Sequence, residues 1–400
     1  MNKTILSKLP VTLFVIILCL SSITILNVQA QAENTWTTLA PMPTPRSGLG
    51  VVAVNDKIYA IGGTTSSGFA PSISGSAVLG NVDIAGHVGT NEEYNPAKNT
   101  WTQKAPMPTP RILFATAVYQ NKIYCIGGKT SSGYTAVNEV YNPVTDNWET
   151  KASIPQSTGW LKATIVGEKI YAIDYYGNNY QYDPGANLWT VKTPAPNAPS
   201  VNQASASFGK KIYVIGGFSQ DSYHNLNQIY DTQTDQWSYG EIPSSSHGGG
   251  SASATIGENA LRLIYVFGVS GNLRQGEEQS FVRVYDPLVN SWDFGTDTTL
   301  GRYNFGVAVV NEILYVVGGH IYSYPGDYAP SGLNEEYTPF GYGTPDPNYI
   351  PPEPTPTPTP TQTPTPIPEP EFPLTTVIAS VVILSIVFLG IFAYFKKRRA

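Results

Sequence analysis

Short runs rich in β-branched and aromatic residues recur along the chain at intervals of roughly 40–65 residues. Each run ends in Ile-Tyr or Leu-Tyr, and a Gly-Gly pair usually begins three residues after that tyrosine. Apolar runs of this composition, bounded by glycine, predict β-strands. The six tyrosines, each given with the residue at the glycine position, are Tyr59 and Gly62, Tyr124 and Gly127, Tyr171 and Asp174, Tyr213 and Gly216, Tyr265 and Gly268, and Tyr315 and Gly318.

The residues around each run predict four strands per repeat. A small apolar segment and a tight polar turn, such as Asn55-Asp56, precede the run and predict an antiparallel hairpin. A third strand ends at a second tyrosine, which usually opens Tyr-Asn-Pro or Tyr-Asp-Pro, because proline lacks the N–H that a strand ladder needs. A tryptophan seven residues after the second tyrosine marks the fourth strand in five of the six repeats. These pairs are Tyr94 and Trp101, Tyr141 and Trp148, Tyr182 and Trp189, Tyr230 and Trp237, and Tyr285 and Trp292.

The sixth repeat lacks this tryptophan, because the matching position after Tyr337 is Thr344, in a proline-rich tail. Trp36 is left unassigned, and its surroundings (NTWTTLAPMPTPR) match those of Trp101 (NTWTQKAPMPTPR) almost letter for letter. The simplest interpretation is a closed ring in which the strand carrying Trp36 completes the last sheet and leaves no edge open. The sequence therefore predicts an all-β fold of six four-stranded units.

The double glycine with its spaced tyrosine and tryptophan resembles the kelch repeat. That resemblance implies a six-bladed kelch-type β-propeller over residues 31–342, closed by an N-terminal strand. The third repeat departs from the pattern with Asp174-Tyr175 at the double glycine, and the fifth departs with Gly268-Val269. Such departures are tolerable because each blade is supported by neighbours on both sides. The repeated tyrosines, tryptophans and glycines are expected to pack between blades.

Both ends of the chain carry apolar segments. Residues 1–30 read as a secretory signal peptide, with Lys3 and Lys8 before an apolar stretch and small residues up to Ala30; an uncleaved anchor is the alternative. Residues 374–395 contain no charge and are long enough for a transmembrane helix. The basic tail 396–400 predicts a cytoplasmic C-terminus. We therefore expect the propeller on the extracellular face of the cell membrane.

A Pro/Thr-rich stalk, residues 343–373, separates the predicted propeller from the predicted membrane helix. Alternating threonine and proline favours an extended chain without helix or sheet. Pro370, Glu371 and Phe372, followed by the apolar span and the basic tail, resemble the PEF-type C-terminal sorting signals of archaeal surface proteins. That resemblance implies a sorting peptidase acting near these residues, and a permanent membrane anchor is the alternative.

Composition argues against several classes of function. The net charge of −6 argues against nucleic-acid binding, which favours a basic face. Cys19 would leave with the signal peptide, so Cys125 is expected to be a buried structural residue without a disulfide or a thiolate metal site. No cofactor is expected. A phosphate-binding glycine loop, a nucleophile elbow and a zinc-protease motif are all missing from the sequence.

Three arginines, Arg46, Arg111 and Arg302, share one position of the repeat, twelve residues before the Ile-Tyr or Leu-Tyr pair. Their repeats are contiguous in a closed ring, so the three side chains are expected in one sector of the channel mouth. Arginine binds carboxylates through two parallel hydrogen bonds, which would suit an anionic ligand. The alternative is that each guanidinium hydrogen-bonds loop carbonyls between blades.

The same side of the predicted ring carries further ligand-binding candidates, His320, Asp174, Tyr134, Tyr223 and Tyr322. Tyrosine among small polar residues is typical of adaptable binding surfaces. We expect a cell-surface, non-catalytic binding or adhesion module for an extracellular protein or glycan, and we assign no catalytic or metal-binding residue. The alternative is an extracellular carbohydrate-active enzyme such as a sugar mutarotase or isomerase, for which Asp174 is the first acid to inspect.

Overall fold

Antiparallel strands account for nearly all of the regular structure in the computed structural model, which describes residues 32–67, 86–198, 201, 203–219, 222–223, 226–242, 250–270, 279–298, 300–323 and 327–349. The one helical segment within these ranges is the short 3₁₀ turn η1 (Pro96–Lys98). The chain divides into two units, Met1–Ile350 and Pro351–Ala400, and all the described residues belong to the first. The predicted all-β class is confirmed for this unit.

Six four-stranded antiparallel sheets, numbered here in the chain order of their inner strands, form this unit. Sheets 1 to 3, each from inner to outer strand, are β2 (Gly50–Val54), β3 (Lys57–Ile61), β4 (Asn91–Asn95) and β5 (Thr100–Lys104); β6 (Ala115–Tyr119), β7 (Lys122–Ile126), β10 (Asn138–Asn142) and β11 (Asn147–Lys151); and β12 (Lys162–Val166), β13 (Lys169–Ile173), β14 (Asn179–Asp183) and β15 (Leu188–Lys192). Sheets 4 to 6 are β16 (Ala204–Phe208), β17 (Lys211–Ile215), β20 (Asn227–Asp231) and β21 (Gln236–Tyr239); β22 (Gly250–Ala254), β23 (Ile264–Ser270), β24 (Gln279–Asp286) and β25 (Ser291–Phe294); and β27 (Gly306–Val310), β28 (Ile313–Val317), β31 (Asn334–Thr338) and β1 (Thr35–Thr38).

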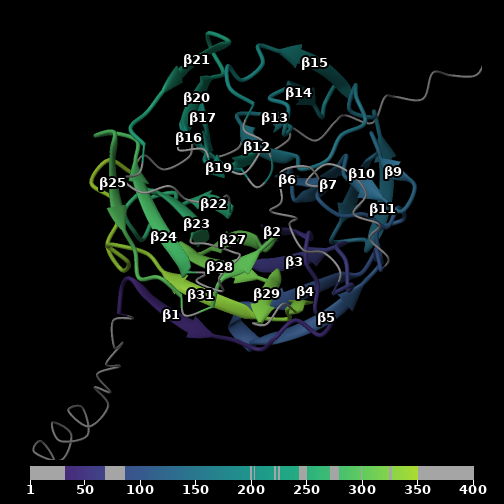
Figure 1. Cartoon of the computed structure of the whole chain (residues 1–400), viewed down its shortest axis with the longest axis horizontal. Helices are drawn as coiled ribbons and strands as arrows, with labels where there is room; N and C mark the ends of the chain where they lie inside the picture. Colours follow the sequence, from purple (N-terminus) through teal and green to yellow (C-terminus); the bar gives the residue numbers. More distant parts are fainter. Residues whose placement is uncertain are drawn as a thin grey trace, which may run out of the picture. The chain divides into compact units, whose positions relative to one another are not determined.

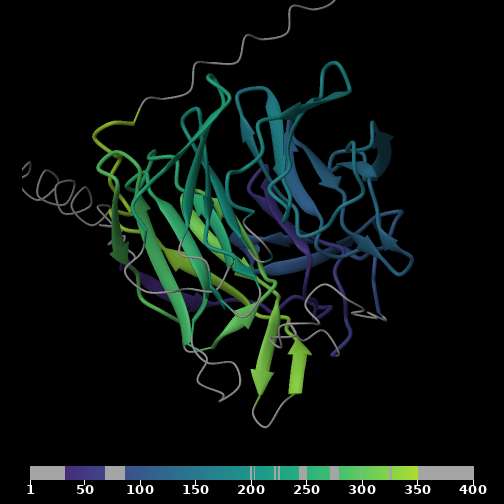
Figure 2. The same cartoon turned by 45° about the horizontal axis from the view of Figure 1, so that its top comes forward.

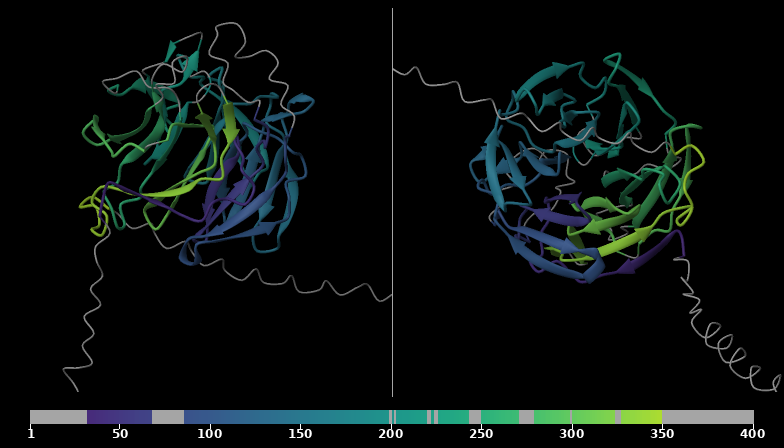
Figure 3. Two further views of the ribbon diagram at one scale, coloured as in Figure 1. Left: turned by 60° about the horizontal axis from the view of Figure 1, so that its bottom comes forward. Right: turned by 180° about the vertical axis from the view of Figure 1, so that it is seen from behind.

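The six inner strands contact one another in a closed cycle, β2–β6–β12–β16–β22–β27 and back to β2. Figure 1 and the right-hand view of Figure 3 show the sheets arranged around this common centre. The inner strands are rich in small residues because they approach each other closely. A Cβ on Gly50 would lie 2.3 Å from Thr116 Cγ2 in the next sheet, and a Cβ on Gly306 would lie 2.3 Å from Val51 Cγ2.

The hydrophobic core lies between the sheets. Six clusters of buried residues each draw members from two neighbouring sheets, so that together they connect every adjacent pair around the ring. Between sheets 1 and 2, for example, Tyr59 and Ile61 pack with Ile123 and Tyr141. Because a sheet buries both faces against its neighbours, its second strand reads as a nearly continuous apolar run.

The N-terminal strand closes the ring, as the sequence predicts. β1 pairs with β31 in antiparallel register, with Trp36 opposite Tyr337, so sheet 6 combines the first and the last strands of the unit. The Trp36 ring lies 5.0 Å from the Tyr337 ring and 5.6 Å from the Phe267 ring of sheet 5. The same cross-strand tyrosine–tryptophan pairing occurs in the other five sheets.

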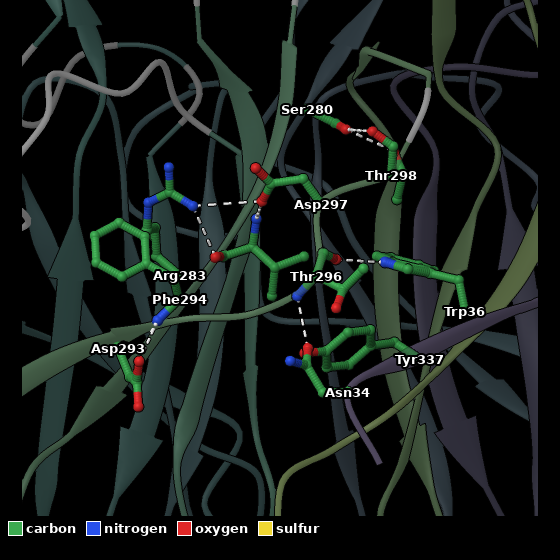
Figure 4. Close-up of polar contacts among 11 residues, drawn as sticks. Asn34, Trp36, Ser280, Arg283, Asp293, Phe294, Thr296, Asp297, Thr298 and Tyr337 are labelled. Carbon is green, nitrogen blue, oxygen red and sulfur yellow. Dashed lines mark hydrogen bonds and ion pairs between the residues drawn. The ribbon is translucent and has the colours of Figure 1, made fainter. Parts of the chain in front are cut away.

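A repeated set of hydrogen bonds, called here the inter-sheet clamp, explains this pairing. At the closing sheet, Trp36 Nε1 donates to the Thr296 carbonyl at 2.6 Å, while the Thr296 N–H and the Tyr337 hydroxyl both donate to Asn34 Oδ1 (Figure 4). Asn34 has a φ of 57°, a left-handed conformation that asparagine and aspartate adopt more readily than most residues. The other clamps hold Ala40, Ala105, Ala152, Thr193 and Glu241 in the same way, through Asn99, Asp146, Asn187, Asp235 and Asn290.

Short additional strands extend one end of the ring, which we call the loop face. They lie in the segments that precede an inner strand or follow a second strand, and they pair with each other. Ser47 bridges Thr64 in sheet 1, and Ile112 bridges Lys129 in sheet 2. Figure 2 shows the hairpin of β29 and β30, which with β26 forms a separate small sheet, projecting from the ring. The additional strands are β8 (Lys129–Thr130), β9 (Gly133–Tyr134), β18 (Phe218–Ser219), β19 (Ser222–Tyr223), β26 (Arg302–Tyr303), β29 (His320–Ser323) and β30 (Asp327–Pro330).

Several sequence predictions fall on segments outside the described residues. These are the signal peptide 1–30, the transmembrane helix 374–395, the basic tail 396–400 and the stalk beyond residue 349. Within the described ranges, the structure contains no helix with the length and apolar character needed to cross a membrane. The placement of the chain at a membrane therefore stays a prediction.

Candidate functional site

Arg46 on the loop face is fully buried inside sheet 1. Its Nη2 forms an ion pair with Glu92 Oε2 at 2.7 Å and donates to the Ala60 carbonyl at 3.0 Å. Its Nη1 donates to the carbonyls of Gly62 at 2.6 Å and Thr90 at 3.0 Å. Burial lowers the pKa of Arg46, and the nearby Glu92 carboxylate opposes that effect.

The other two arginines repeat this arrangement. Arg111 is fully buried, pairs through Nη1 with Glu139 and donates through Nη2 to the Cys125 carbonyl at 2.8 Å. Arg302 is 3% exposed and pairs through Nη2 with Glu335. Each arginine therefore joins the segment before an inner strand to the third strand of the same sheet.

The threonine two residues before Arg46 or Arg111 completes the site around the carboxylate. Thr44 Oγ1 donates to Glu92 Oε1 at 2.7 Å, and Thr109 Oγ1 donates to Glu139 Oε1 at 2.7 Å. Both oxygens of each carboxylate thus have a donor, which a buried charge requires. This geometry explains why the sequence Thr-Pro-Arg occurs in both repeats.

These contacts correct the expectation that the three arginines receive an anionic ligand. Arg46, Arg111 and Arg302 do occupy equivalent positions in neighbouring sheets, but their guanidinium groups are buried and already paired with glutamates of the same sheet. The alternative interpretation is right that the guanidinium groups hydrogen-bond main-chain carbonyls. These carbonyls do not lie between blades, however, because they belong, like the glutamate partners, to the arginine's own sheet.

Asp174 is also fully buried and organises the turn after β13. Its Oδ1 accepts the N–H groups of Tyr176 at 3.0 Å and Asn178 at 2.9 Å. Its Oδ2 accepts the Thr158 hydroxyl at 3.1 Å and the Asn178 side-chain amide at 3.0 Å. With these four hydrogen bonds, Asp174 positions the turn that replaces the double glycine, and the structure does not favour it as an exposed acid for catalysis.

The turn that Asp174 holds presents Tyr175 and Tyr176, whose rings lie beside that of Tyr134 in β9. These three residues are called here the tyrosine cluster. The Tyr175 ring centroid lies 6.2 Å from that of Tyr134 and 3.9 Å from that of Tyr176. Tyr134 is 36% exposed and Tyr176 is 57% exposed, whereas Tyr175 is buried beneath them. Lys129 Nζ lies 5.9 Å from the Tyr134 ring, close enough for a cation–π contact.

Tyr134 was predicted as a ligand-binding candidate, but Tyr175 and Tyr176 were missed. The signal was present in the sequence, because Asp174-Tyr175-Tyr176 stands where the other repeats usually carry glycine. A glycine pair makes a turn without side chains. Asp174 and Tyr175 replace that pair and Tyr176 follows, so two tyrosine rings add a new apolar surface to the loop face.

The remaining predicted candidates do not join this cluster. His320 is fully buried in β29, where its Nε2 lies 3.3 Å from the Ser66 carbonyl oxygen and 3.4 Å from Ser47 Oγ. Burial lowers the pKa of His320 to about 4, so its imidazole is neutral at physiological pH. Tyr223 lies in β19 and Tyr322 lies in β29, but their side chains are outside the described part of the structure.

Two further predictions concern Cys125, which was expected to be a structural residue, and metal binding, for which no residue was assigned. Cys125 is fully buried in β7, and burial raises the pKa of its thiol to about 12, which agrees with the predicted structural role. Among the described residues, no group of three or more histidine, cysteine, aspartate or glutamate side chains is arranged to hold a metal ion.

A cavity of about 450 Å³ lies at the centre of the ring, lined by residues of all six inner strands. None of its lining residues is an aspartate or a glutamate, and its two cationic residues are Lys162 and Arg262. A smaller cavity of about 40 Å³ adjoins it and shares Lys162 as a lining residue.

Comparison with known proteins identifies the repeat. The Kelch motif family matches residues 45–76, 110–155 and 199–243. Kelch-like protein 23 of Pongo abelii is 27% identical over 141 residues, which cover 35% of this chain and 24% of that protein. Kelch-like ECH-associated protein 1A of Danio rerio is 34% identical over 100 residues, which cover 25% of this chain and 14% of that protein. The matched segment thus spans about a quarter or less of the length of these two relatives.

A solved structure supports the fold over a larger part of the chain. The structure of YjhT aligns with a TM-score of 0.56 at 17% sequence identity, covering 73% of this chain and 95% of that one. At this identity the match concerns the fold alone. This structural match agrees with the motif matches and with the six sheets described above. The chain carries kelch repeats and is similar to kelch-repeat proteins.

Proposed function

We propose that this chain is a six-bladed kelch propeller that binds a partner protein through its loop face, with the tyrosine cluster at the centre of the contact. The observation that carries this proposal is the pair of exposed rings, Tyr134 and Tyr176, held over the buried Tyr175. Exposed aromatic rings on a rigid support are the typical anchors of protein interfaces.

The chemistry around the cluster suits a protein surface. Tyrosine buries a large apolar area at a small loss of conformational entropy, and its hydroxyl supplies a hydrogen bond at the edge of a contact. Asp174 fixes the backbone of Tyr176, which reduces the entropy lost on binding. Lys129 beside Tyr134 adds a positive charge, which favours a partner with acidic residues near its apolar contact.

The relatives support a role in protein association. The name of Kelch-like ECH-associated protein 1A describes this relative as associated with ECH, and 100 of its residues align with this chain. Protein association through this propeller requires an accessible loop face. The partner itself is set by the residues of that face, because proteins of one fold differ in function through their sites.

The proposal is tested by a binding screen with the purified chain against arrays of extracellular proteins and of glycans. We expect reproducible binding to at least one protein and a strong loss of affinity for it, of about tenfold or more, in the double variant Tyr134→Ala/Tyr176→Ala. A matched control is Tyr239→Ala, because Tyr239 in β21 of sheet 4 has the same exposed fraction, 57%.

The two variants separate the outcomes. Binding that the cluster variant and the Tyr239 variant lose equally would contradict the assignment of the site. Hits confined to the glycan array, and lost in the cluster variant, would keep the tyrosine cluster as a site but replace the protein partner by a carbohydrate. Conversion of a sugar by the wild-type chain would favour an enzyme.

We further propose that the propeller is displayed outside the cell, with residues 1–30 removed and residues 374–395 in the membrane. The apolar, uncharged composition of residues 374–395 and the basic tail after it support this arrangement. Protease added to intact cells should remove the propeller and leave a small membrane-bound C-terminal fragment. The intact mass of the mature protein then distinguishes a retained anchor from cleavage near Pro370, Glu371 and Phe372.

A further inference from the structure

The central cavity is polar and lacks a lining carboxylate. Seven serine and threonine residues line it, and two of their hydroxyls are already used: Ser251 donates to the Phe305 carbonyl and Thr255 donates to the Leu261 carbonyl. The other five make no hydrogen bond within the described part of the chain and are available to a ligand. They are Thr116, Thr164, Ser205, Ser207 and Ser253.

Lys162 is unusual for its position in the repeat. It pairs with Ile173, two residues after the tyrosine of the second strand, and the other five sheets carry only small residues at this register position. A Cβ on Gly50 at this position would already collide with Thr116 of the next sheet. The five small residues are Gly50, Ala115, Ala204, Ser251 and Gly306.

The Lys162 ammonium group has no carboxylate within ion-pair distance among the described residues, and it makes no hydrogen bond there. It lines both the main cavity and the smaller cavity next to it. Burial lowers the pKa of Lys162 to about 8, because desolvation disfavours the charged form. At neutral pH the protonated form still exceeds the neutral form by roughly ten to one. The cavity therefore holds a positive charge, and none of the described residues that line it is a carboxylate.

A second unpaired donor lies close to Lys162. Asn304 lines the smaller cavity, and its Nδ2 is buried without a hydrogen-bond partner in the described part of the structure. The other cation of the main cavity, Arg262, stacks 4.2 Å above the Phe208 ring. Buried donors and an unpaired ammonium are costly unless a ligand supplies acceptors and negative charge.

We propose that the central cavity is a binding site for a small oxyanion, a carboxylate or an inorganic phosphate, which pairs with the Lys162 ammonium group and accepts hydrogen bonds from the cavity hydroxyls. The volume of about 450 Å³ is large enough for such an anion together with water. The two cavities share no lining residue with the tyrosine cluster, so this site does not rest on the proposed protein-binding site.

The test uses the full chain and two probes, inorganic phosphate and acetate, titrated by calorimetry against a chloride reference of equal ionic strength. We expect at least one probe to bind with one site per chain, and its affinity to fall by about tenfold or more in Lys162→Met. The control is Lys211→Met, because Lys211 in β17 is exposed and does not line the cavity. Binding should also weaken as the pH rises through about 8, where Lys162 loses its proton.

Each outcome decides the proposal. Binding of either probe that Lys162→Met abolishes and Lys211→Met preserves supports it, and comparison of the two probes shows whether the site prefers a carboxylate or a phosphate. Absence of binding by both probes, or binding that Lys162→Met leaves unchanged, would overturn it. If Lys162→Met does not fold, Lys162→Gln provides the same test with a polar side chain.

Discussion

Sheets 6, 1 and 2 differ from sheets 3, 4 and 5 at one position of the repeat, the residue two before the second tyrosine. In the first group this residue is a glutamate that forms a buried ion pair with an arginine of the loop face. In the second group, the residue changes from sheet to sheet. The six residues, in the order of the sheets named, are Glu335, Glu92, Glu139, Tyr180, Gln228 and Arg283.

Sheets 4 and 5 of the second group make comparable connections with different chemistry. In sheet 4 the Gln228 side chain accepts the Asn197 N–H at 3.0 Å and donates to the Asn197 carbonyl at 2.8 Å. In sheet 5 Arg283 pairs with Asp297 at 3.4 Å, and that aspartate is 47% exposed (Figure 4). In these five sheets a polar side chain at this position links the third strand to a neighbouring loop, and a buried ion pair is one of several ways to make that link.

The difference has an energetic consequence. A buried ion pair is not by itself a strong source of stability, because both charges lose their hydration. It does make its sheet sensitive to the loss of one partner, since the remaining charge stays buried. Sheets 6, 1 and 2 should therefore respond to single substitutions at this position much more strongly than sheets 3, 4 and 5.

The largest expected effect follows from Arg111→Met, which leaves Glu139 buried without its cationic partner. We expect the free energy of unfolding to fall by about 3–5 kcal/mol. Chemical denaturation, with the midpoint compared at an unchanged slope, measures this loss. The control is the double variant Arg111→Met/Glu139→Leu, which removes both charges and should recover much of the stability. A loss in the single variant that is no larger than in the double variant would contradict this account.

A second effect concerns the pH dependence of the free energy of unfolding that is linked to His320 in β29. His320 is neutral in the folded state because its pKa is lowered from 6.5 to about 4, so the unfolded chain binds the proton more readily. The stability linked to His320 is complete above pH 6.5 and is lost as the pH falls toward about 4. In His320→Gln this loss should be absent, which denaturation midpoints measured across that window would reveal. Identical pH profiles of the variant and the wild type would contradict the burial of a neutral histidine.

The sequence predicts the architecture well because the repeat signals are local and numerous. The tyrosine–tryptophan spacing corresponds to cross-strand pairs, and the unassigned Trp36 correctly predicts closure by β1. The inter-sheet clamp follows from the same residues, although the Asn or Asp of each clamp was not recognised as part of it.

The site was predicted less well because the partners of its residues are distant in sequence. An arginine in a proline-rich loop, such as Arg46, resembles a surface charge until Glu92 is placed beside it by the pairing of β3 and β4. Lys162 was missed for a related reason. Its significance depends on its alignment with small residues in five other strands, which requires the strand register as well as the spacing.

A smaller effect is expected in sheet 3, where a single hydroxyl, that of Thr158 in the loop before β12, links this loop to Asp174 in the turn after β13. Thr158→Val removes the hydrogen bond from Thr158 to Asp174 Oδ2, but the Asn178 side-chain amide still donates to that oxygen. Because the carboxylate keeps a partner on each oxygen, the cost should be about 1 kcal/mol, well below that of Arg111→Met. Denaturation of both variants under one set of conditions tests this order. If Thr158→Val and Arg111→Met lower the free energy of unfolding by the same amount, the distinction between the two groups of sheets is wrong.

The smallest expected effect compares the clamps that use aspartate with those that use asparagine. Burial raises the pKa of Asp235, but the hydrogen bonds from the Tyr230 hydroxyl and the Thr193 N–H outweigh this and lower it to about 2. The linked stability is present above the ordinary aspartate pKa of 3.8 and is lost as the pH falls toward about 2. Asp235→Asn should fold normally, because Asn99 performs the same function in sheet 1. Its stability should be slightly lower than that of the wild type near neutral pH, and the two should converge in acid. If the difference in the free energy of unfolding between Asp235→Asn and the wild type stays constant across this pH window, the negative charge of Asp235 contributes nothing to its clamp.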